Sequence, residues 1–532
     1  MASTQSAGAG GVRQVSGAEV DEKLAALLSN SQAIAAVASA VEGTIGPKGL
    51  NCMLVDRFGD VTITNDGATI LERIDVSHPA ARLLINTARA QEARVGDGTT
   101  TATLLAAALI AEGVSQVKRG VPVTRIIEGM RAGMAEAIAA CSDLAILVPE
   151  ADSPLARQAA LIAGRGDEGI ADLVVRAAAA VPREKLLGDR GFRLADLVLA
   201  HEAADSELVA GLVLDKTRMS RQMPRRVAPA RIAVLDDALE PESVEEEALA
   251  TESGFRRYMD LRTAFDEGIT RLVNAGVNCV IAQKGVADSA EEVFVQAGVL
   301  TLRRVSAGDI ARVVAHTGAR PLKRAGLRRT AEELATFCGA ADEVYEDERL
   351  SHVRIIGGGG ESSATIVVGA ATREVKDERA RVARDAAFAV QAALQDGVLP
   401  GGGATEIAAC RRVRQLRETA RGMAAYGVDC VIEALKRPVS QIIANAGFNP
   451  LEKVEEVAVA QAEADSPRLA VDCDTGDICD MVELGVVDAA SVKKHALQTA
   501  LETAEAILRI NAVIRKREEK PSSTSGQIED VG

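Results

Sequence analysis

The stretch GDGTTTATLL, residues 96–105, places one carboxylate and three consecutive hydroxyls at the start of a predicted helix. Threonine is β-branched and a moderate helix former, so three in succession contribute little to helix stability. Hydroxyls and backbone N–H groups at a helix N-terminus bind phosphate, and Asp97 suits Mg²⁺, which takes one or two carboxylates plus phosphate oxygens. An elaborate N-cap by Asp97 or Thr99 explains the same residues without a ligand. The stretch alone leaves both interpretations open.

Three further glycine-bearing stretches have the character of phosphate-binding turns, although each also has a purely structural explanation. TIGPKG, residues 44–49, reads as a helix-ending turn or as a loop whose glycines allow close backbone approach to a ligand. TNDG, residues 64–67, reads as a β-turn or as a turn that exposes Asp66. LPGGGATE, residues 399–406, puts three glycines before a helix at an entropic cost that a simple linker would not need. The chain contains no Walker A spacing.

One further carboxylate and one further glycine-bearing stretch are candidates for a functional role. Asp385, in RVARDAAFAV, lies on a predicted alanine-rich helix, where a surface carboxylate is the default and a general base acting on water near a γ-phosphate is the specific alternative. GRGDEG, residues 164–169, matches the G-x-G-x-x-G spacing, but no predicted strand precedes it. It therefore does not indicate a dinucleotide-binding fold.

The composition excludes several classes of protein. The 532 residues exceed what one core holds, so several domains are expected. A formal charge of −15 and only 2% aromatic residues argue against a nucleic-acid binder. Eight scattered cysteines without a C-x-x-C pair argue against zinc or a disulfide framework and fit a reducing compartment. We find no signal peptide and expect no apolar run of about 20 residues, so the sequence predicts a cytoplasmic protein without membrane contact.

The order of predicted elements indicates an α+β multidomain chain. Alanine-rich helices, interrupted by a hairpin around Gly59 and Asp60, fill the two ends, and short β-rich runs alternate with helices in the middle. Such a nested order predicts that the outer segments share one domain. The expected boundaries are a disordered tail at 1–18, a mainly helical domain at 19–145 and 398–515, a small α/β domain at 146–212 and 365–397, an α/β domain at 213–364 with a charged protruding arm near 240–262, and a disordered tail at 516–532.

The succession of TIGPKG, VTITNDGATIL, GDGTTTATLL, ARDAAFAVQAALQDGVLPGGGATE and VDCDTGDICDMVELGVVDAASVKKHAL resembles the chaperonin family. It is most similar to the group II branch, the thermosome and its eukaryotic cytosolic relatives, and its departures from their pattern suggest a divergent bacterial or archaeal lineage. The resemblance covers residues 19–515. It implies an equatorial ATPase domain, an intermediate domain, and an apical domain whose helical protrusion acts as a built-in lid.

The resemblance also implies roles for individual residues at a site for ATP and Mg²⁺. The catalytic residues would be Asp66, which positions the attacking water, and Asp385. The metal ligand would be Asp97. The remaining nucleotide-binding residues would be Thr44, Ile45, Gly46, Pro47, Asn65, Gly98, Thr99, Thr100, Thr101, Arg165, Gly401, Gly402, Asp472, Cys473, Asp474 and Asp488.

The implied function is ATP-dependent encapsulation and folding of unfolded client proteins. The expected assembly is a homo-oligomer of two stacked rings of about eight subunits, with no separate co-chaperonin lid. A soluble phosphotransferase using the same cradle on a small molecule is the alternative, and a nucleotide-binding assembly protein without turnover is another. The sequence departs from the group II pattern where Arg165 stands for the usual Lys, Asp472 for the usual Asn, and Ala489 for a common Pro. An Arg keeps the charge but offers a planar fork, which leaves its sensing role open.

Overall fold

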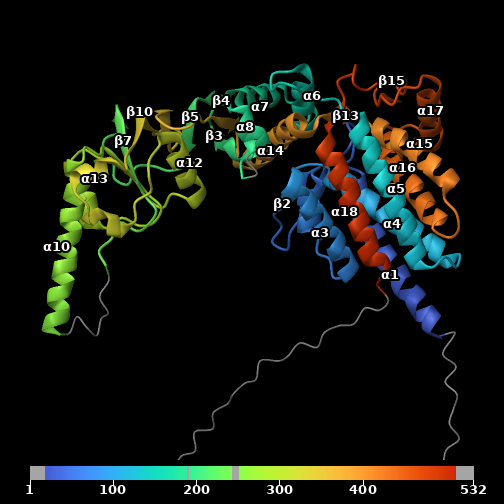
Figure 1. The fold of residues 1–532 in the computed structure, drawn as a ribbon, viewed down its shortest axis with the longest axis horizontal. Coiled ribbons are helices and arrows are strands. Elements are labelled where there is room, and N and C mark those ends of the chain that lie inside the picture. The colour runs from blue at the N-terminus through green and yellow to red at the C-terminus, as the bar shows by residue number, and fades with distance from the viewer. Residues whose placement is uncertain (1–17, 189–190, 243–250, 511–532) are drawn as a thin grey trace, which may run out of the picture.

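The computed structural model describes residues 18–188, 191–242 and 251–510. These residues form three bodies that lie in a row (Figure 1). A helical body stands at one end, a smaller middle body follows, and a distal body that carries the long helix α10 stands at the other end. The chain passes from the helical body to the distal body through the middle one and returns the same way.

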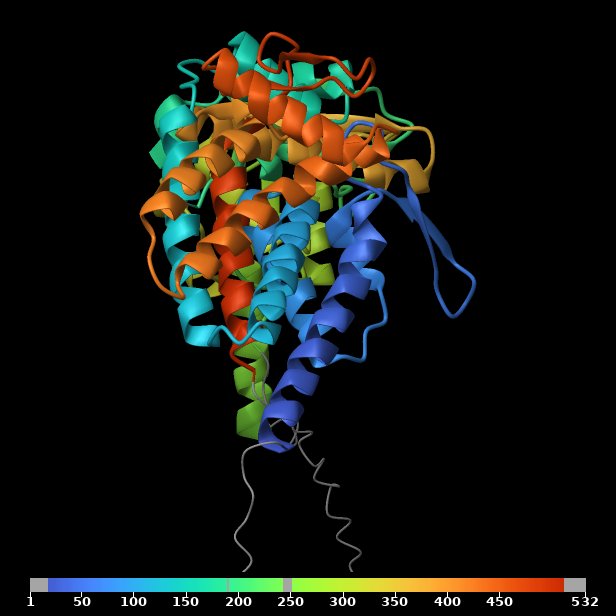
Figure 2. The ribbon, with the colours of Figure 1, turned by 90° about the vertical axis from the view of Figure 1, so that its right-hand side faces the viewer.

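The helical body is built from both ends of the chain (Figure 2). Its first part contains α1 (Ala18–Glu42), α2 (Gly67–Arg73), α3 (Pro79–Val95), α4 (Thr99–Lys118) and α5 (Val123–Leu144). Its second part contains α15 (Ala404–Thr419), α16 (Ala425–Asn445), α17 (Pro450–Glu463) and α18 (Ala490–Leu508). Buried residues from both parts share one core, for example Leu109 and Met130 with Val431 and Leu497. Because this core joins residues more than 300 positions apart, neither part of the helical body can bury its apolar faces alone.

Three short antiparallel strand pairs accompany the helical body. The pair β1 (Cys52–Val55) and β2 (Val61–Thr64) forms the hairpin expected from the sequence, and it projects from the body (Figure 2). The other pairs are β13 (Val398–Pro400) with β16 (Val487–Ala489), and β14 (Leu469–Val471) with β15 (Ile478–Asp480). These two pairs set the glycine-rich turn after β13 beside the loops of the C-terminal part.

The middle body packs helices against a three-stranded sheet. Its elements are α6 (Pro154–Ala163), α7 (Glu168–Ala180), α8 (Arg183–Gly188), the 3₁₀ helix η1 (Leu194–Leu197), β3 (Val198–Glu202), β4 (Glu207–Val209), β12 (Thr365–Ala370) and α14 (Arg373–Asp396). The central strand β12 pairs in parallel with β3 and antiparallel with β4. The helix α14 packs on α6 and α7, and it extends toward the helical body, where it meets α3 and α18.

The distal body is an α/β layer structure, as the alternation of short strands and helices predicted. Its elements are β5 (Gly211–Leu214), β6 (Arg226–Val227), β7 (Ala230–Leu235), α10 (Glu252–Asn274), β8 (Cys279–Ala282), α11 (Asp288–Gln296), β9 (Leu300–Leu302), α12 (Ala307–Thr317), η2 (Arg324–Arg328), α13 (Ala331–Ala335), β10 (Gly339–Asp347) and β11 (His352–Gly358). The sheet order is β5-β11-β10-β7-β8-β9, with β6 also pairing β10, and β7, β8 and β9 run parallel. Separate apolar clusters cover its two faces.

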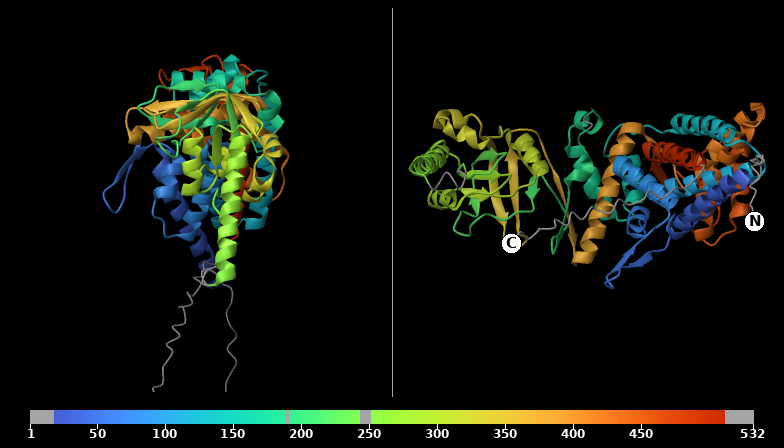
Figure 3. Two further views of the ribbon diagram at one scale, coloured as in Figure 1. Left: turned by 90° about the vertical axis from the view of Figure 1, so that its left-hand side faces the viewer. Right: turned by 90° about the horizontal axis from the view of Figure 1, so that it is seen from below.

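The helix α10 leaves this body as a long rod (Figure 3). Phe255 and Met259, near its outer end, are exposed. Residues 243–250 of the expected arm at 240–262 lie outside the described residues, whereas the described helix continues to Asn274. The C-terminal half of this helix belongs to the distal body, because Phe265, Ile269 and Leu272 are buried in its apolar core.

Two expectations on chain ends and hydropathy need correction or limits. Residues 1–17 and 511–532 lie outside the described residues, but Ala18, assigned to the N-terminal tail, already begins α1. The sequence was expected to hold no apolar stretch of membrane-spanning length, yet the segments Leu24–Glu42 and Thr99–Lys118 are long and apolar enough by length and composition. The second is the helix α4, which packs against α1, α3, α16 and α18. A helix enclosed in this way is apolar around most of its circumference.

Candidate functional site

The GDG turn joins α3 to α4 at the centre of the site. Gly96 ends α3 and Gly98 caps α4, and both have left-handed backbone conformations, with φ of 68° and 76°. A Cβ on Gly96 would overlap the ring of Phe388 on α14, and a Cβ on Gly98 would lie 2.8 Å from Cγ1 of Val492 on α18. Glycine is therefore required both by conformation and by close neighbours. The turn is held between α14 of the middle body and α18 of the helical body.

Asp97 lies inside this turn. Its Oδ1 accepts a hydrogen bond of 2.6 Å from the backbone N–H of Gly98, and the amide nitrogen of Gln91 donates to its carbonyl oxygen at 2.9 Å. Burial raises the pKa of the Asp97 carboxyl, and the charges of Asp488 and Asp66 add to this effect. A carboxylate destabilised by burial and by like charges is one that a cation would stabilise.

The end of the β1–β2 hairpin packs directly on the threonine run. Asp66 caps α2 by accepting hydrogen bonds from the backbone N–H of Thr69 at 2.8 Å and from its hydroxyl at 2.7 Å. A Cβ on the following Gly67 would lie inside van der Waals contact of the Thr100 hydroxyl and 3.0 Å from the Thr99 hydroxyl. The carboxamide oxygen of Asn65 is buried without a hydrogen-bond partner. The structure thus brings TNDG against GDGTTT and leaves a buried acceptor beside them.

The TIGPKG turn rests on α16 and reaches the β14–β15 loop. The amide nitrogen of Asn445 on α16 donates to the carbonyl oxygen of Ile45 at 2.9 Å. Gly46 has a φ of 85°, and it is exposed together with Pro47 and Lys48. The ammonium of Lys48 forms an ion pair with Asp474. This pair links the first glycine turn to residues 472–474, which the resemblance includes among the nucleotide-binding residues.

The segment 472–474 and the glycines after β13 form the C-terminal side of the site. The carboxylate of Asp472 accepts a hydrogen bond of 2.8 Å from the backbone N–H of Asp474, in the turn between β14 and β15. Gly402 has a φ of 60°, and a Cβ there would lie 2.8 Å from the sulfur of Met481. A Cβ on Gly401 would meet Val486 at 2.9 Å. The two glycines thus allow β13 to lie close to the segment that follows β15.

Asp488 belongs to an ion cluster with Lys493 and Glu406. Asp488 lies on β16, and its Oδ2 is 3.1 Å from the ammonium of Lys493, which also forms an ion pair with the buried Glu406. Burial lowers the pKa of Lys493, but the charges of Asp488 and Glu406 outweigh it and raise the net value. One carboxylate oxygen of Glu406 has no hydrogen-bond partner. Thr101 and Thr405 line a small cavity together with Glu406 and Lys493.

Asp385 is not the surface carboxylate that composition alone favoured. It is only 9% exposed, and its Oδ2 lies 2.7 Å from a guanidinium nitrogen of Arg381, one helical turn earlier on α14. The same nitrogen lies 3.5 Å from Oδ1 of Asp66. Burial raises the pKa of Asp385 well above its usual range, Arg381 opposes this, and Asp97, Glu92 and Asp66 add to the rise. The middle body therefore delivers Asp385 to the carboxylates of the helical body.

Arg165, the position of the expected sensor, lies at the edge of this group. It has a positive φ of 54° in the turn between α6 and α7, and its guanidinium lies 3.1 Å from Glu378 of α14. Burial lowers the pKa of Arg165, and the neighbouring charge of Arg381 lowers it further. The helix α6, rather than a strand, comes directly before the GRGDEG turn, so the turn does not have the setting of a dinucleotide-binding motif.

Sequence reasoning missed Glu92, Arg381 and Glu378. Glu92 lies on α3, and burial raises its pKa to about 7, with Asp66 and Asp97 contributing. Arg381 donates to both oxygens of Glu378, at 3.2 and 2.7 Å. The spacing of Arg381 to Asp385, four residues on a predicted helix, was a readable signal that the two share a face. Nothing in the sequence near Glu92 signals its surroundings.

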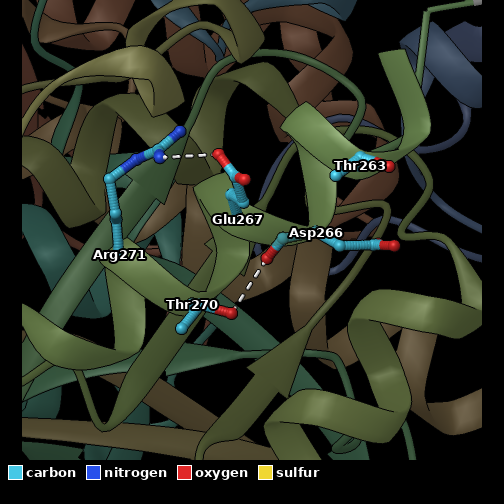
Figure 4. A pocket seen from close by; sticks show the side chains of 5 residues that line it. All are labelled: Thr263, Asp266, Glu267, Thr270 and Arg271. Carbon is cyan, nitrogen blue, oxygen red and sulfur yellow. Dashed lines mark hydrogen bonds and ion pairs between the residues drawn. The ribbon is translucent and has the colours of Figure 1, made fainter. Parts of the chain in front are cut away.

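Other parts of the described chain do not compete with this site. An open depression on α10 is lined by Thr263, Asp266, Glu267, Thr270 and Arg271 (Figure 4). The helix α10 lies at the end of the molecule opposite the helical body (Figure 1). All five belong to one helix, where Thr270 donates to the carbonyl oxygen of Asp266 and Arg271 pairs with Glu267. Among the described residues, no group of three or more His, Cys, Asp or Glu side chains is arranged to hold a metal ion.

Comparison with known proteins identifies the class. The structure aligns with a crystal structure described as a group III chaperonin in the open state, with a TM-score of 0.85, 43% sequence identity, and coverage of 93% of this chain and all of that one. The three bodies are thus those of a chaperonin subunit. The TCP-1/cpn60 chaperonin family model matches residues 37–518, and the chain belongs to that family.

Curated relatives agree with this assignment. The thermosome subunit alpha of Methanothermobacter thermautotrophicus is 33% identical over 90% of this chain and 89% of its own length. The thermosome subunit beta of Archaeoglobus fulgidus is 34% identical over 91% of both chains. The resemblance to thermosomes is confirmed, and the protein is an ATP-dependent chaperonin. The comparisons give no support to the phosphotransferase alternative.

Proposed function

We propose that this chain hydrolyses Mg²⁺-ATP at the junction of its helical and middle bodies, and that it assembles into rings that enclose client proteins. The observation that carries the proposal is the position of Asp385. It lies on α14 of the middle body, yet the Arg381–Asp66 pair and the contact of Phe388 with Gly96 hold it beside the GDG turn. A base delivered from a separate body can respond to movement of that body.

The residues present fit a magnesium-bound triphosphate. The buried acceptor oxygen of Asn65 lacks a donor, which a water molecule beside the phosphates would supply, and the space in front of the threonine hydroxyls is one that a single Cβ on Gly67 would fill. Asp97 would hold Mg²⁺, which needs few protein carboxylates because phosphate and water supply its other ligands.

The roles of the chain's own residues follow from their placement. The turns that contain Gly46, Gly98 and Gly402 would wrap the nucleotide with backbone groups, and Thr99–Thr101 would donate hydroxyl hydrogen bonds to phosphate. When bound, ATP would supply the phosphoanhydride bond that is cleaved, and Mg²⁺ would neutralise the charge of the phosphates. Asp385 would accept a proton from the attacking water while Asp66 orients that water. Asp472–Asp474 and Asp488 would border the base and the ribose.

The remaining parts would turn hydrolysis into encapsulation. The exposed apolar residues of α10, Phe255 and Met259, are suited to contact a neighbouring arm or a client once several subunits surround a chamber. We propose a homo-oligomer of two stacked rings of about eight subunits in the cytoplasm, closed by these arms without a separate lid. We propose the boundaries given above as the limits of the equatorial, intermediate and apical domains.

The test combines turnover with imaging. Purified protein is assayed for phosphate release with Mg²⁺-ATP, and electron microscopy records particles without nucleotide and with a transition-state mimic of hydrolysis. The expected result is steady ATP hydrolysis that the Asp385→Asn substitution abolishes, in double rings that close on addition of the mimic. Wild-type protein that binds ATP but releases no phosphate, even with denatured client, would instead favour an assembly protein without turnover.

A further inference from the structure

We propose that Arg381 is a positioning residue for ATP hydrolysis, because its guanidinium holds the carboxylates of Asp385 and Asp66 at one point of the site. This inference rests on the proposed ATPase function and assigns a role to a residue that the family resemblance left out. Arg381 itself is not required to touch the nucleotide.

The guanidinium of Arg381 contacts three carboxylates at once. One terminal nitrogen lies 2.7 Å from Asp385 and 3.5 Å from Asp66, and the other two nitrogens donate to the two oxygens of Glu378 at 3.2 and 2.7 Å. The paired bonds to Glu378 fix the plane of the fork, as bidentate Arg–carboxylate pairs do. The remaining nitrogen is thereby aimed at Asp385 and Asp66, and the side chain of Arg381 is only 17% exposed.

The guanidinium of Arg381 joins the middle body to the helical body. Asp66 is fixed as the cap of α2 in the helical body, whereas Asp385 and Arg381 ride on α14 of the middle body. An isolated pair four residues apart stabilises a helix only weakly, and the acid is better placed N-terminal to the base, the reverse of the order here. Helix stability therefore does not explain why an arginine stands at position 381. The contact of its guanidinium with Asp66 of the other body explains it.

The crowding of carboxylates explains why a cation is needed at this point. Asp66, Glu92, Asp97 and Asp385 interact electrostatically with one another, and each such contact disfavours a second negative charge. A buried charge without a partner is strongly unfavourable. Arg381 offsets the repulsion, and its charge is therefore a condition for bringing Asp385 close to Asp66.

Arg165 does not duplicate this role. Its guanidinium pairs with Glu378 at 3.1 Å, through the oxygen that also accepts a hydrogen bond from Arg381. Glu378 thus anchors both guanidinium groups, and Arg381 is the one that contacts the two proposed catalytic carboxylates.

The test is the steady-state ATPase of the full-length assembled protein. Arg381→Gln should lower kcat by about tenfold or more and leave KM for ATP within about threefold, because it misplaces the base without removing a phosphate contact. Arg381→Lys, which keeps the charge but loses the fork, should recover part of kcat. The matched control is Arg379→Gln, which removes an arginine of the same helix that pairs with Asp167 at 3.2 Å. Its kcat should stay within about twofold of wild type.

The outcomes separate this inference from the proposed function. If Asp385→Asn is inactive while Arg381→Gln turns over like wild type, the positioning role is wrong and the ATPase proposal stands. If Arg381→Gln raises KM with kcat unchanged, Arg381 binds phosphate and the inference also fails. A fall in kcat that Arg381→Lys does not restore at all, matched by Arg379→Gln, would mean a general loss of α14 structure and would equally overturn it. If the wild type hydrolyses no ATP, or Asp385→Asn hydrolyses it normally, the proposed function itself fails.

Discussion

The contact between Gly67 and the threonine run allows a test of the cradle without touching any ionisable group. Gly67 is the first residue of α2, and an added Cβ would lie inside contact distance of the Thr100 hydroxyl. The Gly67 backbone does not have a positive φ, so alanine fits its conformation, and helix propensity favours Ala over Gly by up to about 1 kcal/mol. Gly67→Ala should therefore leave the folded protein close to wild type in stability and act mainly by turning the Thr100 hydroxyl away.

The magnitude follows from the hydrogen bond that would be lost. A hydrogen bond to a charged group contributes about 1.5–3 kcal/mol, and about 1.4 kcal/mol corresponds to tenfold in affinity. Gly67→Ala should weaken binding of a non-hydrolysable ATP analogue with Mg²⁺ by roughly 10- to 150-fold, as measured by isothermal titration calorimetry. Thr100→Val should do the same. The double variant should bind about as weakly as either single one, because both remove one interaction.

The matched control is Gly43→Ala. A Cβ at Gly43 would meet no heavy atom within 4 Å, and this glycine also lies close to the TIGPKG turn. Its affinity for the analogue should match wild type. Equal affinities of the Gly67→Ala and Gly43→Ala variants, or losses that multiply in the Gly67→Ala/Thr100→Val double variant, would refute the reasoning that the hairpin end presses the Thr100 hydroxyl into the cradle.

Four further predictions concern the charged residues. Asp385→Asn should keep ATP binding but lower turnover about 10²-fold or more, measured by phosphate release, and unchanged turnover would remove it from the mechanism. Asp97→Asn should weaken the Mg²⁺-dependent part of ATP affinity in calorimetry, and an unaltered affinity would contradict the metal assignment. The folded-state pKa of Glu92 is about 7 and exceeds its ordinary value of 4.5, so its contribution to stability is present below pH 4.5 and is lost as pH rises through 7. Without nucleotide, the melting temperature of Glu92→Gln should therefore rise relative to that of the wild type between pH 5 and pH 8. A difference in melting temperature that stays constant over this range would disprove the pKa shift. Lys493→Met should cost about 3–5 kcal/mol in denaturant unfolding because it leaves the buried carboxylate of Glu406 and the half-buried carboxylate of Asp488 without their cation, and Glu406→Gln added to it should recover part of that loss.

Much of the site could be predicted from short stretches of sequence. Gly96, Gly98 and Gly402 were identified from their types and spacing, and each has the positive φ that glycine tolerates best. The hairpin and the α/β centre were likewise predicted, because alternation and turn residues are local signals. The role of Asp385 was less accessible, since its neighbours on α14 are alanines and arginines that suit a surface helix equally well.

The sequence by itself determined the family, the order of the elements and the glycine turns, because these depend on residues close together along the chain. Only the tertiary structure decided which charges meet. Asp66 and Arg381 are 315 positions apart, and their ion pair exists because α14 of the middle body is laid across the end of a hairpin in the helical body. The elevated pKa of Glu92 and the ion pairs of Lys493 with the buried Glu406 and the half-buried Asp488 have the same origin. Electrostatic coupling depends on distance and on exclusion of water, and neither is encoded in local spacing.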